Sequence, residues 1–268
     1  MILYGAPVKE KIKGELIEKV KKLEREPVLA IVQIGGREDS NIYIKQKQKF
    51  ADEIGAKVLV NKFEENISQE DLEEKIKKLN EDKNINGIIV QLPLPKHLDS
   101  EKIINLISVK KDADGLSENL PSKNFQTIPA TARGVMALLD FYEISVVGRK
   151  VAVIGRSKLA GGPIAKVMKE RGGNVTVCHR STENMAQVCR EADILISAAG
   201  KAGLVTKEFV KAGQVVVDVG INRVDGKIVG DVASAEVEPI VASITPVPGG
   251  IGPLTVACLF QNLLDLCG

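Results

Sequence analysis

Apolar and polar residues follow two patterns along this chain, and each pattern predicts a different kind of secondary structure. In residues 8–23 apolar side chains recur every three or four positions among lysines and glutamates, the pattern of an amphipathic helix. Residues 28–34 form an almost continuous apolar run, which predicts a buried strand. A helix should follow, with Asp39 or Ser40 as its N-cap and Gly55 at its end.

The alternation of strands and helices continues through the rest of the chain. Strands are expected at residues 58–60 and 87–92, with a helix between them that starts at Ser68 and reaches Leu79. After an irregular stretch at 116–129, the second series comprises a helix over 131–139, a strand over 150–154, a helix ending at 168, strands over 175–177, 193–196 and 215–217, and a last helix over 252–266. Strands that alternate with helices predict parallel, doubly wound sheets.

Composition and charge narrow the classes of function. Lysines and arginines number 37 against 35 acids, so no excess of positive charge points to a nucleic-acid partner, and tryptophan is absent. No apolar run approaches the roughly 20 residues that span a bilayer, and no secretory signal opens the sequence. Four cysteines without a C-x-x-C pair give no zinc-ligand spacing and suit a reducing compartment. We expect a cytoplasmic protein that binds no metal, membrane or nucleic acid.

A glycine-rich turn in the second series is a candidate dinucleotide site. A strand ends at Gly155 and the next helix opens at Gly161, so backbone N–H groups would face a diphosphate. The spacing is not G-x-G-x-x-G, and such glycines often serve packing alone. Arg180 stands where NAD-binding domains usually carry an acid. Together with Arg156 and Ser157 on the first turn, it favours a 2′-phosphate and therefore NADP, unless it is an ordinary surface arginine.

Small residues follow two further strands of this series. The segments 197–203 and 218–223 would lie at the carboxyl edge of the sheet, where cofactors dock. Gly200 and Ile221, one from each segment, are the candidate cofactor contacts. A small residue such as Gly200 lets a nicotinamide and its ribose approach the backbone. Each segment taken alone could be a mere turn.

Polar side chains gather at one place in the first series. Ser40, Tyr43 and Lys47 are spaced i, i+3 and i+7, which puts a hydroxyl, a phenol and an amine on one helix face. Gln91 lies at the carboxyl end of the third strand, and Asp114 follows a helix that could return the chain there. Open α/β sheets bind ligands at this edge, so these residues predict a substrate site.

Two α/β domains flanking a cleft are the expected architecture. We place a substrate domain at residues 1–120, completed by the final helix at 252–268, and a Rossmann-like NADP-binding domain at 121–245. The rigid Pro/Gly loop at 245–255 leads into that final helix and can set backbone groups against a flat ligand.

Six segments in order along the chain resemble the methylenetetrahydrofolate dehydrogenase/cyclohydrolase family. They are Ser40-x-x-Tyr43-x-x-x-Lys47, Gly87-Ile-Ile-Val-Gln-Leu-Pro-Leu-Pro95, Lys111-Asp-Ala-Asp-Gly115, Gly155-Arg-Ser157, Asp218-Val-Gly-Ile-Asn-Arg223 and Thr245-Pro-Val-Pro-Gly-Gly-Ile-Gly-Pro253. The second and last are highly specific. The chain departs from the family where Asp-Val-Asp-Gly-Phe is usual, with Ala113 and Leu116, and where Pro-Cys-Thr-Pro-Lys-Gly becomes the stretch at 129–134.

The resemblance implies an enzyme that oxidises 5,10-methylenetetrahydrofolate with NADP and hydrolyses the methenyl product to 10-formyltetrahydrofolate. It implies that Lys47, with a depressed pKa beside a cationic substrate, transfers protons during hydrolysis, oriented by Gln91 and supported by Ser40. Tyr43 would stack on the folate, and Asp114 would accept the pterin N–H donors. The further substrate contacts that it implies are Leu92, Pro248, Gly249, Gly250 and Thr255. A homodimer through the cofactor domains is also implied.

Three alternatives stand beside this hypothesis. Tyr43-x-x-x-Lys47 is the catalytic spacing of short-chain dehydrogenases, but there it follows the glycine-rich turn that it precedes here. A family member could keep the dehydrogenase with little cyclohydrolase activity, against which Lys47 and Gln91 argue. A nucleotide-sensing module without catalysis would have to bury Lys47 and Asp114 at a cost that no ligand offsets.

Overall fold

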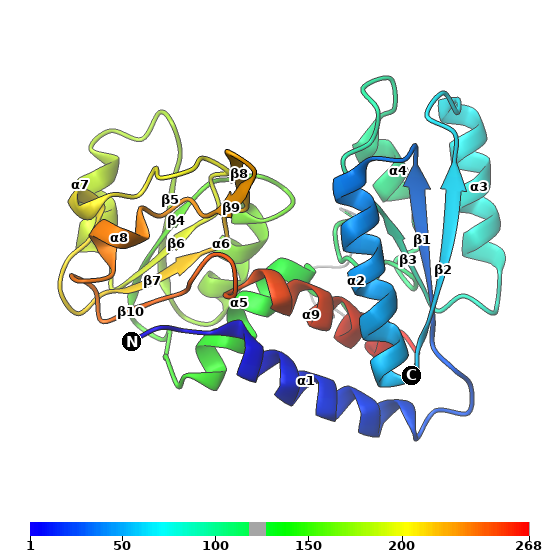
Figure 1. Ribbon diagram of the computed structural model, residues 1–268, viewed down its shortest axis with the longest axis horizontal. Coiled ribbons are helices and arrows are strands. Elements are labelled where there is room, and N and C mark those ends of the chain that lie inside the picture. The colour runs from blue at the N-terminus through cyan, green and yellow to red at the C-terminus, as the bar shows by residue number, and fades with distance from the viewer. Residues whose placement is uncertain (118–126, 268) are drawn as a thin grey trace. The chain divides into compact units, whose positions relative to one another are not determined.

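The computed structural model describes residues 1–117 and 127–267 (Figure 1). Its contacts divide the chain into two compact units. The five-strand unit comprises Met1–Glu10 and Thr131–Thr255, and the three-strand unit comprises Lys11–Ala130 and Val256–Gly268. The irregular stretch expected at 116–129 and the domain limit expected near residue 120 fall largely on residues 118–126, outside the described residues.

The three-strand unit is built on a small parallel sheet. Its strands are β1 (Val28–Ile34), β2 (Lys57–Phe63) and β3 (Gly87–Val90), in the order β2-β1-β3. Its helices include α2 (Glu38–Ile54), α3 (Gln69–Glu81) and α4 (Ser100–Leu106), with most of α1 (Gly5–Val20) and the last part of α9 (Gly252–Asp265). The chain winds outward to β2 and then back past β1 to β3, so the sheet is doubly wound. The ends of β1 and β3 flank its switch point, the usual place for a ligand.

Both faces of this sheet are covered by apolar side chains. Leu72 and Ile76 of α3 and Ile103 of α4 are buried in one cluster with the side chains of β1 and β3. On helices α2 and α9, Phe50 and Phe260 are buried with ring centroids 5.5 Å apart. Because both faces of the sheet are covered, the side chains of β1 are buried on both sides, and its sequence is an almost continuous apolar run.

Helix α2 begins earlier than the sequence indicates. The expectation that Asp39 or Ser40 is its N-cap is wrong, because Arg37 occupies that position and makes no side-chain capping bond. Asp39 instead lies in the first turn, where it accepts a hydrogen bond from the Arg37 guanidinium (2.7 Å). Its negative charge there interacts favourably with the positive end of the helix dipole. Gly55 ends the helix in the left-handed conformation with φ 78°, as predicted.

The five-strand unit carries a larger parallel sheet, flanked by α6 and α7 on opposite sides (Figure 1). Its strands are β4 (Lys150–Ile154), β5 (Asn174–Cys178), β6 (Ile194–Ser197), β7 (Val215–Asp218) and β10 (Ser243–Ile244), in the order β10-β7-β6-β4-β5. Its other elements are α5 (Ala130–Phe141, from Thr131 on), α6 (Gly161–Glu170), α7 (Met185–Glu191), α8 (Ser234–Val237), the 3₁₀ helix η1 (Lys207–Phe209), and the antiparallel pair β8 (Asn222–Val224) and β9 (Lys227–Val229). This is a doubly wound order with its switch point between β4 and β6.

Most of the expected elements are present, with shifted ends. The strand at 150–154 has the predicted bounds, and α3 starts after Ser68, whose hydroxyl accepts a hydrogen bond from the Asp71 N–H (3.0 Å). The third strand is shorter than expected: it ends at Val90, although the Gln91 N–H still donates to the Val32 carbonyl (2.9 Å). No described helix is both long and apolar enough to span a bilayer.

Candidate functional site

Helix α2 and strand β3 place an amine next to an amide at the switch point of the three-strand unit. The Lys47 Nζ donates a hydrogen bond to the Gln91 Oε1 (2.9 Å), and Gln91 Nε2 donates to the Leu92 carbonyl (3.1 Å). The second bond holds the amide so that its oxygen faces the lysine. On the same helix, Ser40 is buried and Tyr43 is 37% exposed. The structure therefore brings Lys47 and Gln91 into direct contact and leaves the ring of Tyr43 accessible.

Asp114 reaches the same unit's site through a segment that runs beside β3. The Ile88 N–H donates to the Lys111 carbonyl (2.6 Å), and the Ala113 N–H donates to the Ile88 carbonyl (3.4 Å). This pairing carries the segment along β3, so that Asp114 follows it towards the carboxyl end, where Gln91 lies. Asp114 and Lys47 attract each other electrostatically.

Burial shifts both members of this pair towards their neutral forms. It lowers the pKa of Lys47, and the negative charge of Asp114 offsets only part of that effect. Burial likewise raises the pKa of Asp114, against the attraction of the Lys47 ammonium. An amine that is neutral more readily than an ordinary lysine can accept a proton, which is what general base chemistry requires.

Asp112, which the sequence did not single out, shapes the turn that holds Asp114. Its side chain is fully buried and accepts hydrogen bonds from the N–H groups of Gly115 (2.9 Å) and Ser117 (2.8 Å). Burial raises the pKa of Asp112 to about 6, although these bonds oppose the shift. Gly115 has φ 68°, and a Cβ there would lie 2.9 Å from the backbone of Ile128. The Asp-x-x-Gly pattern was the available signal for this turn.

A second residue missed from the sequence is Asn262 of α9. It is fully buried, and its Nδ2 donates to the carbonyls of Ala113 (2.8 Å) and Ile128 (2.7 Å). One amide thus links the segment at Ala113, next to Asp114, to the segment at Ile128. Both carbonyls lie more than 130 residues earlier in the chain, so no local pattern indicates this role.

The glycine-rich turn of the five-strand unit has the close contacts that a diphosphate site needs. Gly155 has φ 112°, and a Cβ there would collide with the Ala198 carbonyl. A Cβ on Gly161 would collide with the carbonyl of Gly155, and α6 begins after Ala160 without a side-chain cap. Only glycine fits these positions, and the helix N-terminus behind the turn favours an anion.

Arg156 and Arg180 leave the sheet at the same edge. Ile154 and Cys178 are paired in the register of β4 and β5, and each arginine follows two residues after its paired residue. Both side chains are exposed, as is Ser157. Arg156 thus follows β4, beside the switch point, and Arg180 follows the neighbouring strand β5. Two guanidinium groups after adjacent strands suit an anionic group such as a 2′-phosphate.

The remaining predicted cofactor contacts lie beyond β6 and β7. Ile221 is 49% exposed, and the N–H of Gly200 donates to Asp231 Oδ2 (3.2 Å). Asp231 is fully buried and was not found from the sequence. Its neighbour Asp218 accepts hydrogen bonds from three backbone N–H groups, and burial raises the pKa of Asp218 to about 6 despite them.

The predicted Pro/Gly contacts belong to the five-strand unit, whereas Tyr43, Leu92 and Asp114 belong to the three-strand unit. Pro248, Gly249, Gly250 and Thr255 lie in or directly after a tight loop. The Gly5 N–H donates to the Gly249 carbonyl (2.8 Å), and a Cβ on Gly250 would lie 2.8 Å from the Thr245 Cβ. This packing fixes the backbone of the loop without large side chains.

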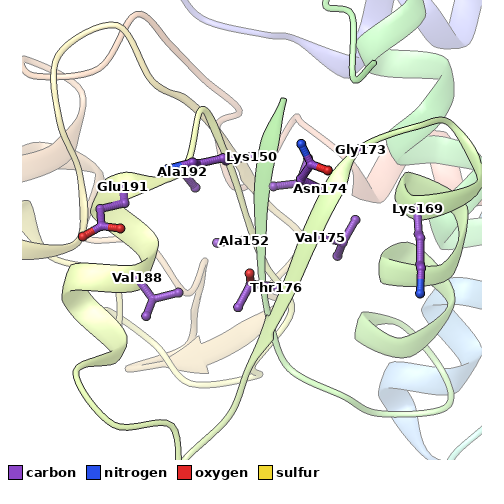
Figure 2. Close-up of a pocket in the computed structure, with 11 residues that line it drawn as sticks. Lys150, Ala152, Lys169, Gly173, Asn174, Val175, Thr176, Val188, Glu191 and Ala192 are labelled. Carbon is purple, nitrogen blue, oxygen red and sulfur yellow. The ribbon is translucent and has the colours of Figure 1, made fainter. Parts of the chain in front are cut away.

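A cavity of about 660 Å³ lies in the five-strand unit, away from these residues (Figure 2). It is lined by the first residues of β4 and β5, including Lys150 and Asn174, and by the ends of α6 and α7, including Lys169 and Glu191. These are the amino ends of the strands, whereas Gly155 follows the carboxyl end of β4. The cavity is therefore not the candidate cofactor site.

Comparisons with known proteins agree with this arrangement. The model of the tetrahydrofolate dehydrogenase/cyclohydrolase catalytic domain matches residues 3–114, and the model of the family's NAD(P)-binding domain matches residues 129–267. The bifunctional protein FolD of Acholeplasma laidlawii is 46% identical over 99% of this chain and 98% of its own.

Solved structures extend the match to the fold. The bifunctional methylenetetrahydrofolate dehydrogenase/cyclohydrolase of Campylobacter jejuni has a TM-score of 0.95 and 41% identity, covering 100% of this chain and 98% of that one. The Trypanosoma brucei enzyme, complexed with NADP and an inhibitor, has a TM-score of 0.94 and 36% identity, covering 100% and 97%. The expected α/β class, with a catalytic and an NAD(P)-binding domain, is confirmed. This chain belongs to the tetrahydrofolate dehydrogenase/cyclohydrolase family.

Proposed function

We propose that this enzyme oxidises 5,10-methylenetetrahydrofolate to the methenyl form with NADP and hydrolyses the methenyl form to 10-formyltetrahydrofolate. The observation that best supports the hydrolytic step is the hydrogen bond of Lys47 to Gln91, with the charge of Asp114 acting on the same amine. A dehydrogenase with little cyclohydrolase activity is the alternative. It gives no reason for an amine with a lowered pKa to be held at this place.

In the hydrolysis, Lys47 acts on the water that attacks the methenyl carbon. The neutral amine accepts a proton as the C–O bond forms, and the cationic substrate further disfavours its ammonium form. The proton then passes to the nitrogen whose bond to that carbon breaks. As the carbonyl forms, the hydroxyl proton of the adduct is released to solvent, which leaves the formyl group on the other nitrogen. Gln91 orients the amine through the hydrogen bond at 2.9 Å, and Ser40 supports the helix face behind it.

We assign folate recognition in the three-strand unit to three residues. Asp114 pairs with the N–H donors of the pterin, where two hydrogen bonds to one carboxylate fix the ring's orientation. The ring of Tyr43, 37% exposed, stacks on the substrate, and Leu92 borders it. Pro248, Gly249, Gly250 and Thr255 offer backbone groups to a flat ligand.

The five-strand unit fits a bound dinucleotide. Gly155 and Gly161 form a tight turn in which any larger residue would collide with the backbone. We assign the diphosphate to this turn. Arg156, Ser157 and Arg180 would hold the 2′-phosphate, and Gly200 and Ile221 would border the nicotinamide half. NADP, when bound, supplies the hydride acceptor for the oxidation. The NADP bound in the related Trypanosoma brucei structure supports this choice of cofactor.

We assign these roles to two domains. The folate site belongs to residues 1–120, completed by 252–268, and the NADP site to residues 121–245. The two family models support a boundary between residues 114 and 129, and the compact units support the return of the last residues to the first domain. The NAD(P)-binding model extends to residue 267, however, and the compact units give residues 1–10 to the five-strand unit.

We also propose that the enzyme is a cytoplasmic homodimer. Strand β5 is the terminal strand of its sheet, and Val177 on it is 39% exposed, which suits pairing with a second copy. Cys178 and Cys189 are buried side by side as free thiols, a state that a reducing compartment maintains.

The test of the two activities uses purified enzyme with 5,10-methylenetetrahydrofolate and either NADP or NAD. Reduced cofactor and methenyl absorbance report the oxidation, and methenyl decay in a separate assay reports the hydrolysis. Lys47→Ala should abolish accelerated hydrolysis, whereas Lys45→Ala, on an exposed position of the same helix, should keep it. Oxidation without accelerated hydrolysis would support the alternative, and neither activity in folded protein would refute the proposal.

A further inference from the structure

One carboxylate of the five-strand unit organises the loops beyond β6 and β7. Asp231 is fully buried, and its two oxygens accept hydrogen bonds from five donors. The donors are Ser197 Oγ (3.0 Å), the N–H groups of Ala199 (2.7 Å), Gly200 (3.2 Å) and Lys201 (2.9 Å), and Asn222 Nδ2 (3.0 Å). This side chain therefore fixes the first residues after β6 and the start of β8 together.

Three of these donors are consecutive backbone N–H groups. A run of such groups forms a concave site for anions, of the kind that binds phosphates. Here the chain fills the site with its own carboxylate. The loop at 199–201 is thus held in one conformation before any ligand arrives, and the phosphates of a dinucleotide are left to the turn at Gly155.

The backbone of Asp231 is anchored in the same region. Its N–H donates to Asp218 Oδ1 (3.0 Å), and its carbonyl accepts from the Val205 N–H (2.9 Å). At the other end of the loop, the Ala198 carbonyl packs so closely on Gly155 that no Cβ fits between them. A continuous set of contacts therefore links Asp231 to the dinucleotide turn.

The location of this loop assigns it to one half of the cofactor. Arg180, after β5, marks the side of β4 that holds the adenosine phosphate. The other half of a dinucleotide crosses the switch point and extends over the ends of β6 and β7. Those are the strands that end at Ser197 and Asp218, beside the loop that Asp231 holds.

We propose that Asp231 is a positioning residue for hydride transfer, which holds the loop against which the nicotinamide half of NADP lies. The inference rests on the proposed use of NADP. Asp231 does not itself touch the reacting atoms. It sets the path of Ala199–Lys201 and of Asn222, and so the surface against which the nicotinamide ring is oriented.

The test is Asp231→Asn, which keeps the size of the side chain. The amide has one acceptor and would point its NH₂ group at N–H donors, so the loop loosens without a cavity. The kcat of the dehydrogenase should fall at least tenfold, and the Kd for NADP should rise about threefold or more. Binding of adenosine 2′,5′-bisphosphate, which lacks the nicotinamide half, and methenyl hydrolysis should stay within twofold.

Two further variants complete the design. Asp225→Asn makes the same chemical change in the exposed turn between β8 and β9, and should leave all four measurements unchanged. Ser197→Ala removes one of the five donors and leaves the carboxylate, so it should lower kcat in the same pattern by a smaller factor. It serves as the test if Asp231→Asn does not fold.

Equal weakening of NADP and bisphosphate binding, or a parallel loss of hydrolysis, would show a general structural role and overturn the inference. An unchanged dehydrogenase kcat would also overturn it. Failure of the wild-type enzyme to use NADP is a separate result, since it contradicts the proposed function before any variant is compared.

Discussion

Lys47 and Asp114 form a partly buried pair of opposite charges in the proposed folate site. Since burial lowers the pKa of Lys47 below its ordinary value of 10.5, the amine loses its proton within a lower pH range. If the neutral amine is the base, hydrolysis should accelerate as pH rises through that lowered pKa and then level off. The measurement is the pH profile of methenyl decay, corrected for the uncatalysed reaction.

Lys47→Arg is the matched variant for this profile. A guanidinium keeps its charge throughout the accessible pH range, so the variant should show no rising limb and little acceleration. A wild-type rate that keeps rising to the ordinary lysine range, or an active arginine variant, would contradict a base with a lowered pKa.

Asp112 should make stability depend on pH. Its pKa is raised from 3.8 to about 6, so the folded state favours the protonated carboxyl. This contribution is fully present below pH 3.8, is lost as pH rises through 6, and amounts to about 3 kcal/mol in order of magnitude. In urea unfolding, wild type should gain stability relative to Asp112→Asn at pH 4.5 compared with pH 7.5. A difference that is constant with pH would refute this assignment.

The residues that could be predicted from the sequence are those whose chemistry shows in their own spacing. Ser40, Tyr43 and Lys47 repeat at helical intervals, so their shared face follows from helix geometry. Asp231 and Asn262 could not be found in this way. Their roles depend on which distant backbone groups the fold brings to them, and an isolated aspartate or asparagine carries no trace of those partners.

Helix α9 contributes the buried amide of Asn262, and Asn262→Ala tests its effect on the site. The change leaves the buried carbonyl of Ala113 and the part-buried carbonyl of Ile128 without this donor, at roughly 1–3 kcal/mol for the first and less for the second. Because the first carbonyl adjoins Asp114, we expect a lower free energy of unfolding together with a KM for folate raised several-fold.

Asn80→Ala separates these two effects. Asn80 also bridges backbone groups, donating to the Leu106 carbonyl (2.8 Å) and accepting from the Ser108 N–H (2.9 Å), in the same unit but apart from Asp114. It should lower stability without changing the KM for folate. If both variants raise KM equally, Asn262 has no specific link to the substrate turn.

Among whole elements, length decides what the sequence could reveal. Strands β1 and β4 are buried apolar runs of seven and five residues, and their bounds were predicted correctly. Strand β10 has only two residues and pairs with β7 through Ser243 and Ile244, so no periodicity exists to detect. Helix α2 was predicted with the wrong N-cap, because an Asp-Ser pair resembles a cap even when both residues lie within the first turn.

At the scale of the whole molecule, the proposed homodimer is a prediction that the edge of one sheet allows us to test. Among the strands that the structure describes, β5 pairs with β4 alone and so ends its sheet. Its exposed residues Thr176 and Val177 lie on a free edge whose backbone groups can pair with another chain.

Val177→Lys should break this dimer, because a charge on an edge strand opposes pairing with a copy that carries the same charge. Ile228→Lys is the matched control: it changes a side chain of similar exposure, 42% against 39%, on strand β9. Light scattering should give twice the chain's mass for wild type and for Ile228→Lys, and the mass of one chain for Val177→Lys. Because a two-fold interface presents the same edge from both copies, one substitution places two lysines in it. A monomeric wild type, or a dimeric Val177→Lys, would remove β5 as the interface.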